Sequence, residues 1–158
     1  ARAAGTARNS LNQPAPGRGS TSCCCLIDRP GTVYFDPTTD DLFSLFQKPG
    51  STYWIAEERG KIIGGCGIYS TPGLPEGCVE LVILYLDPLY RGKGTGRKLI
   101  DLAIESAKQS GYRQIYLESL PELGRAISLY EKAGFRLISG PMGNSGHFGC
   151  DIWMLKDM

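Results

Sequence analysis

Apolar and polar positions alternate, or apolar residues run continuously, along several stretches between residues 51 and 156. Runs of this kind that are rich in β-branched residues are typical of strands, and glycine-containing breaks mark the turns between them. A tight turn at Arg59-Gly60 divides the first run into two strands. The predicted strand regions are residues 51–70, 78–87, 112–119, 135–139 and 150–156.

Three other stretches carry helical signals. Residues 38–50 combine a Thr/Asp N-cap with an apolar face and a Pro-Gly end, which predicts a short helix. Apolar residues recur at helical spacing from Leu99 to Ala107, and Gly111 stands where this second helix should end. Pro121 begins the third helix, and Gly134 closes it.

The order of these elements is a helix followed by β-β-β-α-β-α-β-β. It predicts the α+β class, with a mixed, mostly antiparallel sheet that is flanked by helices and contains one parallel βαβ crossover. The strand at 78–87 is the most apolar, so we expect it to be buried on both faces. Only Glu80 interrupts its apolar run.

Composition narrows the classes of partner. The chain has 158 residues, of which 42% are hydrophobic and 21% charged, and this is ordinary for one globular domain. The formal net charge of +1 gives no electrostatic reason for nucleic acid or an anionic membrane as a partner. The longest apolar run, 79–86, is too short to cross a bilayer. We therefore expect neither kind of partner.

The six cysteines give only a weak metal signal. Residues 23–25 are consecutive cysteines, no CxxC pair occurs, and the single histidine, His147, lies three residues before Cys150. Cys66 and Cys78 fall in strand patterns, which favours buried packing over a nucleophilic role. We expect no metal site and interpret the cysteines as thiols of a cytoplasmic protein.

The N-terminal residues differ from the rest of the chain. Residues 1–22 contain three arginines and no acidic residue, and they lack apolar periodicity. This composition is typical of a disordered leader, or more weakly of a transit peptide. We therefore divide the chain into an atypical segment, 1–32, and a single domain, 33–158.

Residues 91–96 form a glycine-rich, positively charged turn between a predicted strand and a predicted helix. Its glycines let the backbone approach a ligand closely, and amides at a helix N-terminus favour an anion. Arg91, Lys93, Arg97 and Lys98 add positive charge. The turn predicts a phosphate-bearing ligand, and the alternative is a solvated turn with ordinary surface cations.

Two common phosphate-binding patterns fit this turn poorly. A P-loop needs Gly-Lys followed by Ser or Thr, but Arg97 stands five residues after Gly92. The dinucleotide fingerprint fits Gly92 and Gly94 and also has Arg97 in place of its last glycine. A nicotinamide-dependent oxidoreductase is thus disfavoured, although Glu118 lies about where a ribose-binding acid would.

A third pattern fits the turn better. Arg91-Gly-Lys-Gly94-Thr-Gly96 matches the (Q/R)xxGx(G/A) signature of the GNAT superfamily of acyl-CoA N-acyltransferases, and RAISLYEKAGF at 125–135 resembles a second motif of that superfamily. Two motifs in the same order are more specific than either alone. The resemblance covers residues 33–156. It implies two neighbouring parallel strands that splay apart, with acetyl-CoA held in the gap between them.

The resemblance further implies an N-acetyltransferase that moves an acetyl group directly from acetyl-CoA to an amine of a small molecule or peptide. Backbone groups of Leu84, Tyr85 and Leu86 would contact the acetyl group and pantetheine. The backbone amides of the turn would hold the pyrophosphate. The residues of the turn are Arg91, Gly92, Lys93, Gly94, Thr95 and Gly96.

Two catalytic residues are implied by the same resemblance. Tyr130 takes the position of the family's usual acid and would protonate the departing thiolate, unless it is only a core tyrosine. Glu80 would be the base, directly or through water, unless it is a solvent-facing carboxylate at a strand edge. Tyr116 and Glu118 would line the acceptor side.

The chain also departs from the family pattern. Leu123 stands where the family frequently has an asparagine that binds pantetheine. Residues 1–32 have the length of the family's first strand and helix but not their composition, so either they drape irregularly on the domain or the residues that fold there are not those of the printed sequence. His147 is expected in a surface loop. The main alternative is a non-catalytic acyl-CoA-binding regulatory domain, and a homodimer is compatible with the resemblance.

Overall fold

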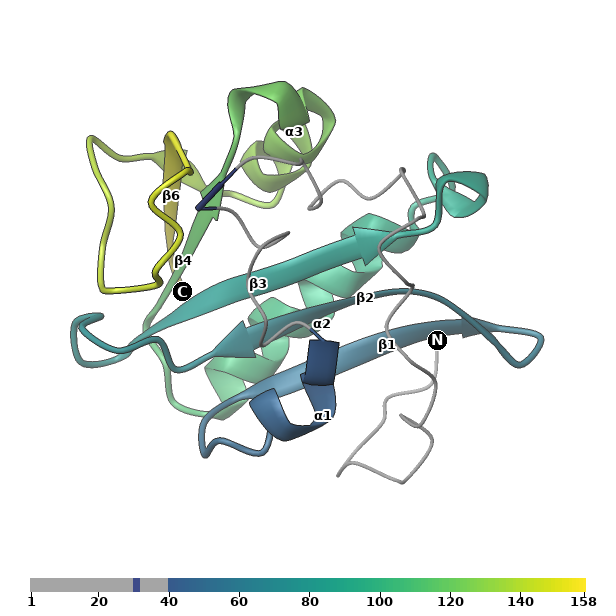
Figure 1. The fold of residues 1–158 in the computed structure, drawn as a ribbon, viewed down its shortest axis with the longest axis horizontal. Helices are drawn as coiled ribbons and strands as arrows, with labels where there is room; N and C mark the ends of the chain where they lie inside the picture. The colour runs from purple at the N-terminus through teal and green to yellow at the C-terminus, as the bar shows by residue number, and fades with distance from the viewer. Residues whose placement is uncertain (1–29, 32–39) are drawn as a thin grey trace.

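The computed structural model of the chain describes residues 30–31 and 40–158. These residues build one six-stranded sheet with the spatial order β1-β2-β3-β4-β6-β5 (Figure 1). The strands are β1 (Thr52–Glu58), β2 (Lys61–Tyr69), β3 (Cys78–Leu86), β4 (Gln114–Ser119), β5 (Arg136–Leu137) and β6 (Ile152–Asp157). Only β3 and β4 pair in parallel, and the other neighbours are antiparallel.

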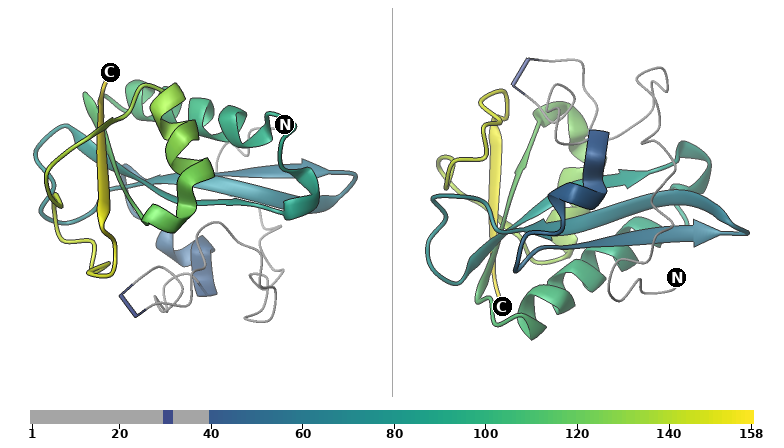
Figure 2. Two further views of the ribbon diagram at one scale, coloured as in Figure 1. Left: turned by 90° about the horizontal axis from the view of Figure 1, so that it is seen from above. Right: turned by 60° about the horizontal axis from the view of Figure 1, so that its bottom comes forward.

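Helices cover both faces of the sheet. The helices are α1 (Leu42–Leu45), α2 (Thr95–Gln109) and α3 (Gly124–Lys132), with short 3₁₀ turns η3 (Pro88–Tyr90) and η4 (Pro121–Leu123). Figure 2 shows α2 and α3 on one face and α1 on the other. Because α2 connects β3 to the parallel strand β4, it is the predicted βαβ crossover. The α+β prediction is confirmed.

The core lies mainly between the sheet and α2. The apolar face that the sequence predicts for this helix is buried, with Ile100, Ala103 and Ala107 at zero exposure. Opposite it lie the fully buried side chains of Ile68, Val79 and Ile115 from three successive strands. No helix in residues 30–31 and 40–158 has both the length and the apolarity needed to cross a membrane.

Three predicted elements differ from those observed. The first helix spans only Leu42–Leu45, and residues 32–39, where its start was predicted, lie outside the described residues. The strand predicted at 135–139 shortens to β5, because only Arg136 and Leu137 pair with β6. Apart from Pro30 and Gly31, the predicted N-terminal segment also lies outside the described residues.

The glycines of β2 make room for an aromatic side chain that crosses it. Tyr53 on β1 extends over β2, and its hydroxyl donates a hydrogen bond of 3.2 Å to the carbonyl of Ile83 on β3. A Cβ at Gly65 would lie 2.5 Å from the Tyr53 ring, and a Cβ at Gly67 would lie 2.7 Å from the rings of both Tyr53 and Phe46. The Gly-rich sequence of β2 is therefore required by close packing.

Replacing Gly67 with alanine should lower the free energy of unfolding by about 1–3 kcal/mol, because two packed rings must move. Gly140→Ala is the matched control, since nothing lies within 4 Å of a Cβ at that position. Its effect should stay within about 0.5 kcal/mol. Urea denaturation measures both, and equal stability of the two variants would contradict this account of β2.

Candidate active site

The site is built where β3 and β4 separate. Their parallel pairing covers only three positions, from Cys78↔Gln114 to Glu80↔Tyr116. Beyond Glu80, β3 continues to Leu86 along β2, while β4 continues to Ser119 along β6. The two strands leave their common start in different directions (Figure 1). The splayed strands implied by the resemblance are thus present.

A β-bulge lies in β3 just beyond this point. Two residue steps on β2, from Gly65 to Gly67, oppose three on β3, from Val82 to Tyr85. Ile83 has a φ of 51°, which is strained for a β-branched residue. The Tyr53 hydroxyl holds the Ile83 carbonyl in this arrangement. A bulge bends its strand and redirects side chains, so it turns β3 away from β4.

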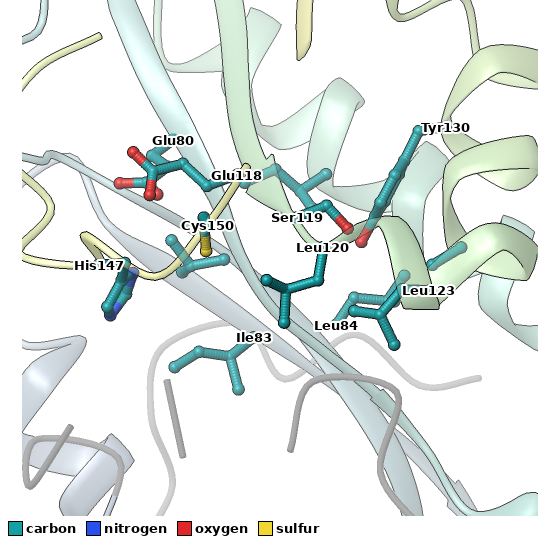
Figure 3. Close-up of a pocket in the computed structure, with 13 residues that line it drawn as sticks. Glu80, Ile83, Leu84, Glu118, Ser119, Leu120, Leu123, Tyr130, His147 and Cys150 are labelled. Carbon is teal, nitrogen blue, oxygen red and sulfur yellow. The ribbon is translucent and has the colours of Figure 1, made fainter. Parts of the chain in front are cut away.

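A pocket, called here the first pocket, opens between the separated strands (Figure 3). Its walls are β3 from Glu80 to Leu84, the end of β4 at Glu118 and Ser119, residues of η4 and α3 including Tyr130, and two residues of the loop before β6, His147 and Cys150. The pocket therefore combines residues that are far apart in sequence. Of the three predicted acetyl-contact residues, Leu84 lines it, whereas Tyr85 and Leu86 do not.

The glycine turn follows the end of β3. Gly92 and Gly94 have φ angles of 74° and 82°, and nothing lies within 4 Å of a Cβ built on either. Gly94 is the N-cap of α2 and provides no side-chain cap, so an external acceptor can reach the first helical amides. The Arg91 side chain donates a hydrogen bond of 3.0 Å to the Leu86 carbonyl, which fixes the turn to the strand. These features fit a phosphate group.

Arg97 has a different role from the one expected. Its Nε donates to the Asp101 carboxylate at 2.9 Å, and its Nη1 donates to the carbonyl of Lys132 at 2.8 Å. The guanidinium thus connects α2 to the end of α3. Its charge is partly balanced by Asp101, so the positive potential of the turn depends more on Lys93, whose ammonium lies 5.2 Å from the centre of the Tyr90 ring.

Glu80 lies at the point where the strands separate, and it is only 3% exposed. The alternative of a solvent-facing carboxylate is therefore wrong. Burial raises the pKa of Glu80 to about 7, the nearby charge of Glu118 raises it as well, and a hydrogen bond from the Thr71 hydroxyl opposes the rise. A buried carboxyl group with a pKa near neutrality can both accept and release a proton under ordinary conditions.

Glu118 organises the loop that precedes β6. Its Oε1 accepts a hydrogen bond of 2.8 Å from the Tyr116 hydroxyl, and its Oε2 accepts one of 3.0 Å from Ser145. The backbone amide of Met142 donates to the Tyr116 oxygen at 3.1 Å, and the amide of His147 donates to the Ser145 oxygen at 3.1 Å. The predicted acceptor-side role therefore fits Glu118, while Tyr116 is fully buried and positions the loop.

His147 is half-buried in the pocket wall, although the sequence favoured a surface loop position. Its imidazole, the Glu80 carboxylate and the Glu118 carboxylate each place one potential ligand atom within 4.8 Å of the others. Figure 3 shows the two carboxylates side by side with the imidazole below them. The three residues could hold a cation, so the expectation of no metal site stays a prediction.

A second pocket meets the first at Glu80. It lies toward α1 and is lined by Leu45, by Tyr69 and Thr71 from the end of β2 and the loop after it, and by the 144–147 loop. Glu80, Ile83 and His147 line both pockets. The buried carboxylate therefore stands between two connected spaces.

Tyr130 lies at the other end of the first pocket from Glu80 (Figure 3). The residue is 7% exposed, and its ring packs edge-on against Phe135 with 6.0 Å between the ring centres. The core position and the pocket position that the sequence offered as alternatives are both occupied, because the ring is in the core while the residue lines the pocket. Leu123 lines the pocket as well.

Cys66 and Cys78 are buried, as predicted. Burial raises the pKa of the Cys66 thiol to about 12 and that of Cys78 to about 11. Thiols that stay protonated are poor nucleophiles, so an acyl-carrying role is excluded for both. Cysteines 23–25 lie outside the described residues.

Several residues of the site had no signal in the sequence. Thr71 sits in a loop, and nothing in its spacing predicts a hydrogen bond to Glu80 nine residues later. Ser145 contacts Glu118 across 27 positions of sequence. Ile83 is a good strand former whose positive φ contradicts local preference. Only the three-dimensional arrangement identifies these residues.

The family model described as the Acetyltransferase (GNAT) family matches residues 22–135 of the chain. This range contains both motifs and both separating strands. The chain belongs to this acetyltransferase family. Family membership confirms the predicted resemblance and supports an acetyltransferase that uses acetyl-CoA as co-substrate.

Relatives of this GNAT protein are found among named proteins and solved structures. Over 128 residues it is 38% identical to the uncharacterized N-acetyltransferase YjgM of Escherichia coli strain K12, covering 81% of this chain and 77% of that protein. It is 29% identical to human N-acetyltransferase 8 over 118 residues, but these span only 52% of the human protein and 70% of this chain.

The solved structures agree with the GNAT fold. An acetyltransferase of the GNAT family from Staphylococcus aureus Mu50 has a TM-score of 0.70 at 23% identity, with 83% of this chain and 80% of that chain covered. A phosphinothricin acetyltransferase from Sinorhizobium meliloti, in complex with AcCoA, has a TM-score of 0.61 at 25% identity, with 73% and 65% covered.

The raised pKa of Glu80 predicts a pH-dependent stability of this GNAT domain. The folded state binds the Glu80 proton more tightly than the unfolded state, whose pKa is 4.5. The stability from this group is therefore full below pH 4.5 and lost as pH rises through about 7. Glu80→Gln should thus gain relative to the parent protein as pH rises, by up to about 3 kcal/mol.

Urea unfolding of both proteins at and below pH 4.5 and again well above pH 7 measures this difference. Glu105→Gln removes an exposed carboxylate from α2 and is the control, for which we expect no comparable trend. A Glu80→Gln difference that does not change with pH would refute the raised pKa.

Proposed function

We propose that the chain transfers the acetyl group of acetyl-CoA to an amine of a small molecule or peptide, with Glu80 as the base. One observation carries this proposal: a buried carboxylate with a pKa of about 7 stands where two pockets meet, at the point where β3 and β4 separate. One pocket suits the acyl donor and the other the amine.

The donor would bind along the separated strands. The backbone amides at the start of α2 and the open glycines Gly92 and Gly94 suit a pyrophosphate. The first pocket leads from there toward Glu80 and suits pantetheine and the acetyl group. Leu84, Tyr85 and Leu86 lie on this stretch of β3, and their backbone groups would contact the acetyl end. A backbone N–H there would stabilise the developing oxyanion.

Acetyl transfer needs a neutral amine and a protonated leaving thiolate. Glu80 takes the proton of the bound ammonium, and the free amine then attacks the thioester carbonyl. A C–N bond forms, the C–S bond breaks, and Tyr130 supplies the proton that the departing thiolate needs. The matching pKa of Glu80 supports the first transfer, and the position of Tyr130 in the first pocket supports the last.

The second pocket would hold the acceptor. Its volume is about 200 Å³, which suits the amine-bearing end of a molecule and leaves the rest outside. We also propose a cytoplasmic location, because Cys66, Cys78 and Cys150 are free thiols. Acetyl-CoA turnover with a panel of amines tests the activity. Binding of acetyl-CoA without any turnover would instead favour the non-catalytic regulatory domain, and binding of NADH alone would favour an oxidoreductase.

Gly94→Val should weaken acetyl-CoA binding by about tenfold or more, because a branched side chain would stand over the amides that bind pyrophosphate. Gly111→Val is a closely matched control. Gly111 follows the opposite end of α2, has a φ of 83° against 82° for Gly94, and likewise has nothing within 4 Å of its Cβ. Both substitutions carry similar backbone strain, and calorimetric titration with acetyl-CoA separates strain from binding. Equal affinities would contradict the assignment of the turn.

Tyr130→Phe should reduce kcat by about 100-fold while leaving acetyl-CoA affinity nearly unchanged, because the ring packing stays and only the proton donor is lost. The control is Tyr112→Phe, which removes a hydroxyl that donates to the Gly50 carbonyl outside both pockets. Steady-state kinetics combined with calorimetry measures both effects. Unchanged turnover in Tyr130→Phe would exclude the tyrosine as the acid.

A further inference from the structure

The junction of the two pockets holds more negative charge than a general base alone requires. Glu80 and Glu118 face each other there, with His147 beside them, and one ligand atom from each lies within 4.8 Å of the others. Among the described residues that line the two pockets there is no lysine or arginine. The described lining therefore offers no cationic side chain to balance either carboxylate.

The hydrogen bonds of Glu118 fix the carboxylate but do not neutralise it. Both partners, the hydroxyls of Tyr116 and Ser145, are uncharged donors. Tyr116 is itself immobilised by the core and by the Met142 amide. Each carboxylate oxygen can accept more than one hydrogen bond, so the group keeps capacity for a further donor. Glu118 is half-buried and lines the first pocket next to Glu80.

Glu80 has unused capacity as well. Thr71 donates to its Oε2, and its Oε1 has no hydrogen-bond partner in the described part of the chain. The side chain is 3% exposed, so solvent gives this oxygen little compensation. Figure 3 shows the Glu80 carboxylate beside that of Glu118, at the side of the pocket where His147 lies. An incoming group with several N–H donors and a positive charge would satisfy both carboxylates.

We propose, resting on the proposed function, that Glu118 binds the ammonium form of the acceptor and selects amines that carry no carboxylate beside the reacting nitrogen. The acceptor class is then simple amines, diamines, amino-acid amides and peptide N-termini, not free α-amino acids. The carboxylate of a free amino acid is two bonds from the nitrogen, so it would enter the space between Glu80 and Glu118 with no described cation to pair with.

This selection adds no step to the reaction. The ammonium binds between the two carboxylates and transfers one proton to Glu80, while Glu118 stays ionised. The released amine then attacks as described above. Glu118 is thus a specificity residue, and its removal should change which acceptors react more than it changes acetyl-CoA binding.

The test compares acceptors that differ only in the carboxylate. Leucinamide is assayed against leucine, and 1,4-diaminobutane against 4-aminobutyrate, with the whole chain and with EDTA present. We expect kcat/KM to favour the carboxylate-free member of each pair by at least about tenfold. Glu118→Gln keeps an acceptor for the Tyr116 hydroxyl and removes the charge, so the preference should fall toward one. The exposed Glu105→Gln on α2 should keep it.

The same pairs are titrated calorimetrically into the protein saturated with CoA, so that the selection is measured even without turnover. Preferential binding of the amide and the diamine, lost in Glu118→Gln, with no turnover of any amine would refute the proposed catalysis and uphold the selection. Equal or stronger binding of the carboxylates, or an unchanged preference in Glu118→Gln, would overturn the selection. A requirement for added Zn²⁺ would also overturn it, since the cation at the junction would then be a metal.

Discussion

The separation of β3 from β4 is the constraint on which the rest of the structure depends. Only three residue pairs join the two strands, and the last of them contains Glu80. A sheet normally continues its ladder as far as the strands allow, so this opening has to be maintained. The bulge at Ile83 turns β3 away, and Tyr53 holds that bulge from the far side of β2. The glycines of β2 follow from the same need, because a side chain at Gly65 would collide with Tyr53. A structural feature of β2 that looks like weakness in the sequence thus serves the site on β3.

Burial of Glu80 at the opening gives the site its chemistry and lowers the stability of the domain at neutral pH. Desolvation keeps its pKa at about 7, and the single donor, Thr71, offsets only part of that effect. A fully compensated carboxylate would be more stable in the fold and a weaker base. Glu118 stands on the other side of this balance, since it is held by two hydroxyl donors and its charge makes the Glu80 proton harder to lose. Two neighbouring carboxylates thus have different environments, which suits one to proton transfer and the other to binding.

Much of the fold could be predicted from the chain, and much of the site could not. Strands, helices and the glycine turn depend on local periodicity and on Gly and Pro positions, so the crossover through α2 was predictable from Leu99 to Ala107. Glu80 could be singled out because a lone acid in an apolar strand is unusual. Thr71, Ser145 and the half-buried His147 could not, because their roles depend on loops brought together by the sheet. The assignment of Arg97 to the anion site illustrates the same limit. Its charge was visible in the sequence, whereas its contacts with Asp101 and Lys132 depend on the packing of α2 against α3.

The same division explains why family membership identifies the donor side better than the acceptor side. The GNAT family model matches residues 22–135, which include the splayed strands, the glycine turn and Tyr130. Ser145, His147 and Cys150 lie in the loop that begins after this range ends. That loop is fixed to β4 through Glu118, and with Thr71 it forms the wall of the second pocket. The acceptor is therefore set by residues whose identities the shared motifs do not determine. A relative that is 38% identical can share the donor machinery and still act on a different amine, and the charge at Glu118 is the physical property that would distinguish them.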